Sequence, residues 1–474
     1  MTKKVSIHWF RKDLRLSDNP SLNYLSTKKH PVICLYIYDD INAERQLGKT
    51  SKVWLHHSLN FLNQQLQGNL LIFRGNPKKI FDDLCRSLYV ENISWNRCYE
   101  IHEIKRDKLL KLFFKQKKIN VNSFNGSLLW EPWEILKKDA TPYKIFTPYF
   151  KKGCMRFTLP RVPETKKSNF FDHDINSLRV DDLDLLSNHK WEFEVIKNWN
   201  VGEKYAYDLM NSFFENGGID DYKDGRNFPG KKNISKLSPY ICWGQISPNV
   251  LWYKTDEYKN KISNSNLDSF RNQLGWREFS YYLLYHFPFL PKKNLRPKFD
   301  RFPWKKRDKK FIKWTKGLTG YPIIDAGMRE LRKTGYMHNR VRMIVGSFLV
   351  KNLLQHWKNG EEWFWDCLFD ADIANNSASW QWVAGTGTDS TPYFRIFNPI
   401  TQGKKFDPNG KYTKTYVPEL QDLPIKYLFN PWECPDKILK NSGITLGLNY
   451  PLPIIDLKSS RDLALSSFSS IKAG

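Results

Sequence analysis

The segment from Trp380 to Pro399, WQWVAGTGTDSTPYFRIFNP, mixes aromatic side chains with glycines, threonines and an aspartate, and places Arg395 between two aromatics. A core segment would instead be apolar with a regular period. The composition of this segment is therefore not that of an ordinary core segment. Upstream, Asp370, Asp372 and Asn376 stand between apolar stretches, where these residue types also commonly cap helices.

The charge of the chain indicates a class of partner. It carries 75 Lys and Arg against 49 Asp and Glu, a formal net charge of +26 at pH 7. Such a balance favours a polyanionic partner, either nucleic acid or an anionic membrane surface. A lysine-biased composition is the alternative, because pairs such as Lys28-Lys29 and Lys309-Lys310 read as replaceable surface positions.

Seven scattered cysteines, never spaced CxxC, indicate neither a disulfide framework nor a zinc site, so we expect a reduced, cytoplasmic setting and no bound metal. The N-terminus turns polar after a few apolar residues, and we find no apolar run of about 18 residues. A signal peptide or a membrane-spanning helix is therefore not expected. The 18 tryptophans remain to be explained.

The first 130 residues alternate between two patterns. Short β-rich runs are separated by stretches of helical spacing, which predicts a doubly wound parallel sheet with helices on both faces. The predicted strands are Val5–Phe10, Val32–Tyr38, Leu70–Arg74, Ile93–Trp95 and Val121–Phe124. A sheet of this kind commonly binds a ligand beyond its strand ends, but neither GxGxxG nor a Walker motif is present.

Residues 131–200 read as a long linker, and residues 201–474 as a helical domain. The fold class is therefore α/β followed by all-α. Asp325 is a candidate N-cap and Gly335 a residue just past a helix end. The helices predicted after residue 200 are Glu203–Glu215, Gln245–Tyr258, Ser269–Phe287, Asp325–Thr334, Arg340–Trp357 and Glu361–Phe369.

Six ordered motifs resemble the DNA photolyase and cryptochrome family, most closely its bacterial cyclobutane pyrimidine dimer photolyases. The motifs are WFRKDLRLSDNPSL, LSPYICWGQISP, LGWREFSYYLL, TGYPIIDAGMREL, TGYMHNRVRMIVGSFLVKNLL and the long stretch that begins DADIANNSASWQWVAGTGTD. The resemblance implies an antenna domain over 1–130, a linker over 131–200, and a helical domain over 201–474 that holds FAD. The activity implied is blue-light repair of cyclobutane dimers by an electron from fully reduced FAD.

The resemblance also assigns flavin contacts. The segment NISKLSP matches a phosphate-contacting turn, although Ile234 stands where the family usually has threonine. Asn376 is expected to face a ring nitrogen, and Arg340 to pair with Asp370 beside the ring. The full set of implied flavin contacts is Tyr222, Ser235, Lys236, Leu237, Ser238, Phe270, Arg277, Arg340, Asp370, Asp372 and Asn376.

Tryptophan is more often core filling than chemistry, and we assign Trp54 and Trp133 to the core. Trp380, Trp357 and Trp304 match a family chain that passes an electron from the surface to the flavin. The sequence separations cannot show that these rings are close.

A damaged base inside a duplex must be flipped out, and photolyases are among the enzymes that do this. By resemblance, Trp276 and Trp382 clasp the flipped dimer, and the glycines and threonines of 385–391 form a tight turn beside it. The implied substrate or DNA contacts are Arg226, Gln273, Trp276, Asn339, Arg342, Met343, Trp382, Arg395 and Gln402.

Gln273 is the main departure, because dimer photolyases usually carry a glutamate there. Glutamine keeps an N–H donor but transfers no proton. Photolyases of the (6-4) photoproduct resemble the chain at Gln273, yet they carry a catalytic histidine and its partner where Asn339 and Met343 stand. His338 is expected to be structural. A (6-4) photolyase and a cryptochrome-like photoreceptor without repair activity are the alternatives.

A second, antenna chromophore is left open. His102 and Glu103 stand where relatives that bind methenyltetrahydrofolate use an amide and a carboxylate, and the amide is missing. A deazaflavin, a flavin or no antenna are the other options. We expect UV-damaged DNA as the partner, no protein partner, no membrane, and a monomer.

Overall fold

The computed structural model describes residues 4–41 and 43–471. The chain divides into two units, one that spans residues 1–216 and 235–288 and one that spans residues 217–234 and 289–474. The first unit runs past residues 130 and 200, so the domain boundaries expected there stay a prediction. Each unit is described by itself.

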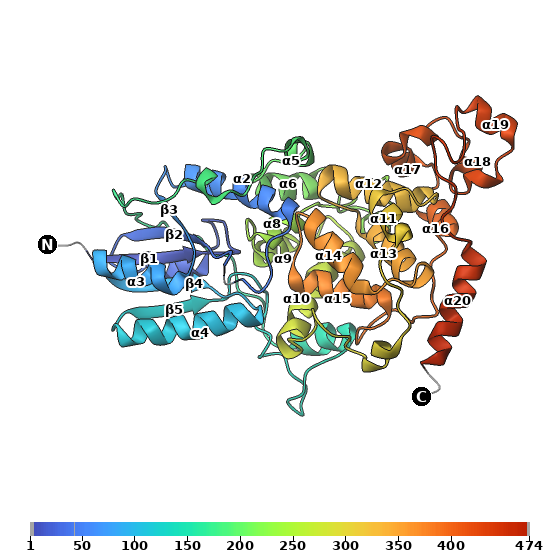
Figure 1. The fold of residues 1–474 in the computed structure, drawn as a ribbon. Helices are drawn as coiled ribbons and strands as arrows, with labels where there is room; N and C mark the ends of the chain where they lie inside the picture. Colours follow the sequence, from blue (N-terminus) through green and yellow to red (C-terminus); the bar gives the residue numbers. More distant parts are fainter. Residues whose placement is uncertain (1–3, 42, 472–474) are drawn as a thin grey trace. The chain divides into compact units, whose positions relative to one another are not determined.

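A parallel sheet of five strands organises the first unit. The strand order is β3-β2-β1-β4-β5, visible from one edge of the sheet to the other in Figure 1. The strands are β1 (Lys4–Phe10), β2 (Val32–Tyr38), β3 (Leu70–Arg74), β4 (Tyr89–Asn96) and β5 (Asn120–Phe124). Their order reverses between β1 and β4, which makes the sheet doubly wound and confirms the predicted fold class.

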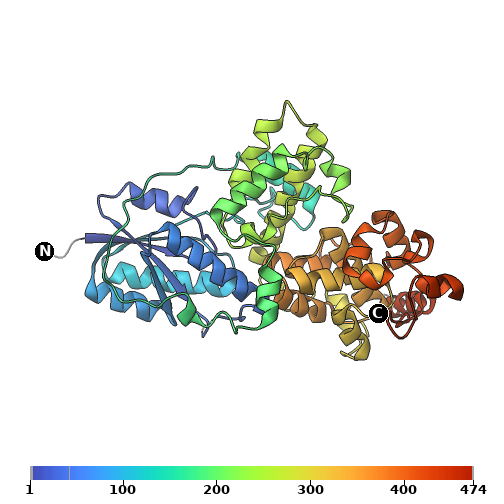
Figure 2. The same ribbon diagram turned by 90° about the horizontal axis from the view of Figure 1, so that it is seen from above.

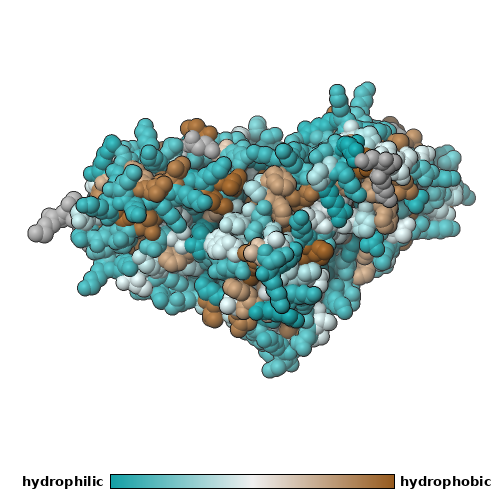
Figure 3. Space-filling view, turned by 90° about the horizontal axis from the view of Figure 1, so that it is seen from below, coloured by the Kyte–Doolittle hydropathy of each residue, from teal (hydrophilic) through white to brown (hydrophobic). Residues whose placement is uncertain are grey.

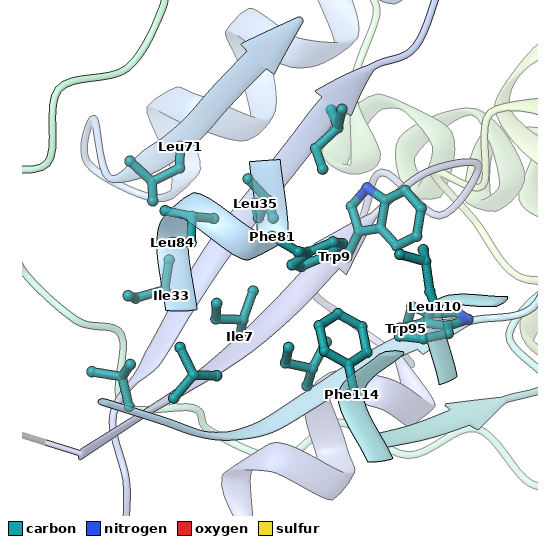
Figure 4. Close-up of a cluster of buried hydrophobic side chains, with 14 residues drawn as sticks. Ile7, Trp9, Ile33, Leu35, Leu71, Phe81, Leu84, Trp95, Leu110 and Phe114 are labelled. Atoms are coloured by element: carbon teal, nitrogen blue, oxygen red, sulfur yellow. The ribbon is translucent and has the colours of Figure 1, made fainter. Parts of the chain in front are cut away.

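Four helices connect the strands: α1 (Pro20–Ser26), α2 (Lys49–Gln65), α3 (Pro77–Ser87) and α4 (Ile101–Gln116). Proline at the first position and an asparagine cap, Asn19 for α1 and Asn76 for α3, fix two of the helix starts. One face of the sheet, including Ile7 and Trp9, packs against Phe81 of α3 and Phe114 of α4 (Figure 4). Strand residues buried on both faces explain the near-continuous apolar runs in the sequence.

The linker of the first unit is largely irregular, and Figure 2 shows part of it as a long green trace beside the sheet. Phe170 forms an isolated parallel bridge with Val32 at the start of β2. The later elements of this unit are the π-helix Pro148–Gly153, the 3-10 turns Cys154–Arg156, Asp181–Leu183 and Asp256–Tyr258, and the helices α5 (Lys190–Ile196), α6 (Glu203–Glu215), α8 (Ser238–Cys242), α9 (Pro248–Lys254) and α10 (Asn264–His286).

In the described part of the second unit the regular elements are all helices, joined by loops, as the sequence predicts for this region. Its longer helices are α11 (Lys309–Lys316), α12 (Pro322–Thr334), α13 (Asn339–Ser347), α14 (Trp357–Cys367), α15 (Ile373–Ala384), α16 (Pro399–Phe406) and α20 (Leu457–Ser470). The short ones are α7 (Tyr222–Gly225), α17 (Lys411–Tyr416), α18 (Ile425–Leu428), α19 (Asp436–Asn441), the π-helix Phe348–Asn352 and the 3-10 turns Pro297–Arg301, Pro418–Leu420 and Pro431–Glu433.

Two helix predictions need correction. The helix predicted over Arg340–Trp357 is broken, because Leu354 takes a positive φ of 53° and His356 caps a new helix, α14. Asp325 does not cap α12, which begins at Pro322. Its carboxylate lies in the first turn and accepts hydrogen bonds from the backbone N–H groups of Thr319 and Gly320. Gly335 ends α12 in the left-handed conformation, as predicted.

The two tryptophans that were predicted to lie in the core differ in burial. Trp54 is fully buried and donates to Gln245, as expected, but Trp133 is 40% exposed, so its assignment to the core is wrong. Its indole lies beside Tyr285 and the Arg97 guanidinium, a surface cluster rather than a core. The surface in Figure 3 is mainly hydrophilic with small separate apolar patches. Among the described helices, none has the length and apolar character needed to span a bilayer.

Candidate functional site

Asn376 lies on the buried side of α15 and has a fixed orientation. Its amide nitrogen donates both to the carbonyl oxygen of Glu361, at 2.9 Å, and to Glu361 Oε1, at 2.8 Å. With both N–H groups engaged, the amide presents its oxygen to any further partner, and that oxygen can only accept. Glu361 was not identified from the sequence, because it lies on another helix, α14.

Asp372 caps α15 by accepting from the backbone N–H of Asn375 at 2.7 Å, and only 3% of its surface is exposed. This capping role is the one that the residue type favours by itself. A buried carboxylate at a helix start also lies close to the first turn, which carries Asn376. The cap therefore fixes the start of the helix that presents the amide.

Asp370 forms its ion pair with Arg342 and not with Arg340, so the expected pairing is wrong. The Arg342 guanidinium is bidentate, with N–O distances of 2.9 and 3.1 Å. It also donates to the carbonyl of Met337, and Asp370 and Tyr336 raise the pKa of Arg342 against the effect of its burial. Its predicted contact with DNA remains a prediction.

Arg340 lies elsewhere on α13. It donates to Asn227 at 2.5 Å, and its guanidinium lies 4.3 Å from the ring centre of Phe406. Burial, with Arg226 nearby, lowers the pKa of Arg340. Since Arg340 and Arg342 stand about 200° apart around the helix, only one of them can reach Asp370.

The residues of the second unit fit the ring of a bound flavin. Ser377 Oγ and Arg340 Nε are buried with no hydrogen-bond partner among the described residues. Ser377 and Asn376 are neighbours near the start of α15, and unsatisfied buried donors and an acceptor oxygen are the groups that a polar heterocycle would engage. Tyr222 of α7 is buried, which raises its pKa, and the Arg226 guanidinium lies 5.6 Å from its ring centre.

In the first unit, Ser235, Lys236, Leu237 and Ser238 form a turn that leads into α8. Lys236 has a positive φ of 53°, and Leu237 is right-handed. Consecutive residues of opposite hand point their backbone N–H groups toward one side, which is an anion-binding arrangement. This geometry fits the diphosphate of a flavin dinucleotide, and Ile234 supplies no hydroxyl there.

Helix α10 carries four of the predicted residues. Phe270 is buried against Phe213 and Phe214, with ring centres 5.7 and 5.4 Å away. Gln273 is half-buried, and Arg277 donates to the carbonyl of Ser127 at 2.7 Å. The side chains at 270, 273 and 277 recur at three- and four-residue steps and so share one side of the helix.

Trp276 of α10 is part of a stack of aromatic rings. The ring of Phe146 lies 3.9 Å from that of Trp276 at an interplanar angle of 12°, and Phe150 stacks behind Phe146 at 5.5 Å. One face of the indole is therefore covered, and the ring is held in one orientation. Phe146 was missed by the sequence analysis because it lies in the irregular linker.

Helices α14 and α15 bury the inner tryptophans. A methyl group at Gly360 would lie 2.1 Å from Cη2 of Trp380, and the ring of Phe364 lies 5.0 Å from that of Trp380. Trp357, Gly360 and Phe364 recur along one face of α14. Trp357, which is fully buried, therefore lies on the face that packs against Trp380. Trp304 is half-buried beside Phe302.

The loop after α15 begins at Gly385, whose φ is +83°, and turns tightly because Thr386 and Gly387 both donate to the carbonyl of Gln381. This confirms the predicted turn. Lys351 is fully buried beneath the loop and donates to the carbonyls of Pro392 and Arg395. Burial, with Arg395 nearby, lowers the pKa of Lys351 to about 7.

The remaining substrate-side residues lie on or near the surface of the second unit. Trp382, Met343 and Gln402 are half-buried, whereas Asn339 and Arg395 are exposed. His338 caps α13 by accepting from the backbone N–H of Arg340, so its expected structural role is confirmed. Trp276 and Trp382 belong to different units, and their pairing stays a prediction.

His102 and Glu103 begin α4. His102 is half-buried, with Nδ1 3.7 Å from Glu44 and 3.9 Å from Glu100. Glu103 is buried; burial alone would raise its pKa, but Lys12 and nearby arginines lower it. Glu103 Oε2 has no hydrogen-bond partner among the described residues.

Comparisons with known proteins agree with this geometry. A family model described as "DNA photolyase" matches residues 6–167, and one described as "FAD binding domain of DNA photolyase" matches residues 270–470. A deoxyribodipyrimidine photo-lyase of Agrobacterium fabrum is 42% identical, covering 98% of this chain and 98% of its own. Cryptochrome-2 of Arabidopsis thaliana is 34% identical, covering 98% of this chain and 79% of its own.

The solved structures give the same result. A bacterial class III photolyase from Agrobacterium tumefaciens superimposes with a TM-score of 0.96 at 40% identity, over 100% of this chain and 99% of its own. The chain therefore belongs to the DNA photolyase and cryptochrome family and carries its FAD-binding domain.

Proposed function

We propose that this chain is a light-driven DNA lyase that splits cyclobutane pyrimidine dimers in UV-damaged DNA. The observation that carries the proposal is the 42% identity to a deoxyribodipyrimidine photo-lyase along nearly the whole of both chains. FAD, when bound, supplies the light absorption and the electron for the cleavage. The chain supplies orientation, hydrogen bonds and the DNA-binding surface.

We assign the flavin-binding roles from the contacts above. The turn at Ser235–Ser238 binds the diphosphate through backbone N–H groups, with the side chain of Lys236 adding positive charge. The oxygen of Asn376 accepts a hydrogen bond from the ring, because Glu361 engages both of its N–H groups. Arg342 neutralises Asp370 beside that position, the role first expected of Arg340.

Trp276 supplies a stacking surface for the flipped base. Phe146 covers one face of the indole, so we assign the opposite face to the ligand, and a ring that is already oriented loses little entropy on binding. From the resemblance we assign the second stacking wall to Trp382. The residues assigned to the dimer itself are Asn339, Met343 and Gln273. The residues assigned to phosphates are Arg226, Arg395 and Gln402. Because these phosphate contacts release counterions, affinity for DNA falls steeply as salt rises.

Trp380, Trp357 and Trp304 form the path by which oxidised flavin is reduced in the light. Gly360 and Phe364 of α14 pack against Trp380, and Trp357 lies on the same face of that helix by its spacing, which supports the inner step. Each step moves one electron inward, and an external thiol restores the electron at Trp304.

Gln273 favours a second function, repair of the (6-4) photoproduct, because glutamine replaces the usual glutamate. Asn339 and Met343 oppose it, since neither is a histidine. A cryptochrome that signals without repair is the third alternative, supported by the 34% identity to cryptochrome-2. The antenna chromophore stays open among the options given above. The monomeric state and the cytoplasmic location stay predictions.

The test is illumination of the anaerobically reduced protein with oligonucleotides that carry either lesion. We expect blue light to split the cyclobutane dimer into two intact pyrimidines and to leave the (6-4) photoproduct unchanged. Repair of only the (6-4) lesion would favour the second function, and no repair of either would favour a photoreceptor. A protein whose DNA affinity is independent of salt would contradict the DNA-binding surface.

A further inference from the structure

The imidazole of His356 lies between two of the tryptophans. Its ring centre is 5.3 Å from Trp304, in an edge-to-face arrangement, and 5.5 Å from Trp357, at an interplanar angle of 31°. Both separations fall in the range of directly packed aromatic rings. His356 is therefore a ring in contact with both indoles.

Two local features hold the imidazole there. His356 caps α14, and its Nδ1 accepts a hydrogen bond from the backbone N–H of Lys358 at 3.1 Å. Lys305, next to Trp304, forms an isolated parallel bridge with Gln355, next to His356, and donates to the carbonyl of Leu354. The backbone itself thus places Trp304 beside His356, and the cap bond fixes the orientation of the imidazole.

The histidine is uncharged at ordinary pH. Burial lowers the pKa of His356 to about 4, and Lys358 acts in the same direction, whereas Asp300 and Glu362 oppose it. Nδ1 is an acceptor in the cap, so the remaining proton of the neutral ring is on Nε2. A positive charge at this position would repel a second positive charge on either neighbouring indole.

The indole proton of Trp357 is held in a hydrogen bond. Its indole N–H donates to Asn294 Oδ1 at 2.7 Å, and Asn294 Nδ2 donates to Asp300 Oδ1 at 2.6 Å. The second bond assigns the amide orientation and leaves the oxygen to the indole. An amide oxygen is not a base at ordinary pH, so Trp357 can lose an electron without losing its proton.

We propose that His356 is a positioning residue of the electron path, an uncharged ring that links Trp304 to Trp357. This inference rests on the electron path in the proposed function. One electron leaves Trp304 and fills the hole on Trp357, and an external thiol then reduces Trp304. The imidazole gains and loses no electron; it fills the contact between the two indoles and keeps positive charge away from them.

Two substitutions separate this role from a structural one. His356→Asn keeps a good helix cap but removes the ring, whereas His356→Phe keeps the ring and removes the titratable group. The assay uses holoprotein with oxidised flavin and a thiol. We expect His356→Asn to lower the yield of light-driven flavin reduction at least several-fold, and His356→Phe to keep the wild-type yield. Repair by chemically reduced protein should be unchanged in both, because it bypasses the path.

The pH profile supplies a second readout. As pH falls from 6 toward 4, the photoreduction yield of the wild-type protein should fall, while that of His356→Phe should not. Independently of any light reaction, histidine NMR of the holoprotein in the dark, with the signal assigned through His356→Asn, should show His356 titrating well below 6.5. Titration near 6.5 would overturn the packed, uncharged ring.

Trp357→Phe distinguishes the two levels of failure. If Trp357→Phe leaves photoreduction intact, the electron path of the proposed function is wrong. If Trp357→Phe abolishes photoreduction but both His356 variants match the wild type at every pH, the path stands and the role of His356 is wrong.

Discussion

Trp380 and Trp382 stand two residues apart on α15, yet they belong to different environments. Trp380 is 3% exposed and packs against Phe364 and Gly360 of α14. Trp382 is half-buried near the end of the helix, before a loop that carries the exposed Arg395. Two residues correspond to about 200° around a helix, so adjacent tryptophans of one short segment can serve a buried electron path and an exposed binding surface.

The same contrast applies to the residues beneath each tryptophan. Trp380 is fixed by apolar packing, through the rings of Trp314 and Phe364 and through Gly360, where a side chain would collide with it. The loop beyond Trp382 is held by hydrogen bonds from Lys351, a buried cation under two carbonyls. The first environment is insensitive to pH, and the second is not.

The largest expected effect separates the two tryptophans. Trp382→Ala should weaken dark binding of an oligonucleotide that contains a dimer by ~1–3 kcal/mol, the usual contribution of a ring stacked on a base, and leave light-driven flavin reduction unchanged. Trp380→Phe should abolish photoreduction and leave binding unchanged. Fluorescence anisotropy and flavin absorbance measure the two properties. If both variants lose both properties, the division of α15 into two roles is wrong.

Gly360→Ala tests the buried side. The added methyl group would lie 2.1 Å from Trp380, so ring or helix must shift, at ~1–3 kcal/mol of unfolding free energy. Denaturant unfolding followed by tryptophan fluorescence measures the loss. Gly230→Ala is the matched control, because its nearest neighbour would lie 3.5 Å away. Equal stability of the two variants would contradict the packing of Trp380 on α14.

Lys351→Met tests the loop side. The pKa of Lys351 is lowered to about 7 in the folded protein, while that of the unfolded chain stays near 10.5. Between these values the unfolded state binds more protons, so the wild-type protein gains stability as pH rises. Relative to Lys351→Met, the gain from pH 7 to 9 should be about 2 kcal/mol. Parallel stability curves of the two proteins would show that folding does not lower the pKa of Lys351.

Gln273→Glu should have the smallest effect. A carboxyl group can hydrogen-bond the carbonyls of a dimer and share a proton with them, which glutamine cannot. We expect a modest increase in dimers repaired per absorbed photon, with DNA affinity unchanged. An unchanged repair yield would show that this departure from the family pattern is neutral.

The sequence predicted most of the fold because the signals are local. Strands such as Val32–Tyr38 are apolar β-branched runs, and Gly335 marks the end of α12. The break before His356 could not be predicted, because it depends on the bridge between Lys305 and Gln355, which are far apart in sequence. Residues 340 to 357 by themselves have continuous helical spacing.

The site residues were predicted through the resemblance. The errors in that prediction concern contacts that depend on the tertiary structure. Whether Arg340 or Arg342 reaches Asp370 depends on the rotation of α13, which no local pattern specifies. Glu361 and Phe146 were missed because each acts through another residue, Asn376 or Trp276, on a different element. Trp133 was placed in the core on residue type alone.

The most direct test of the central claim is a dark-versus-light comparison on one substrate. Protein reduced under anaerobic conditions is mixed with a DNA strand that carries one thymine dimer, and intact thymines are counted after blue illumination. The account predicts restoration of the thymines in the light, none in the dark, and no loss of flavin reduction over many turnovers. A fully reduced, DNA-bound protein that leaves the dimer intact in the light would contradict it.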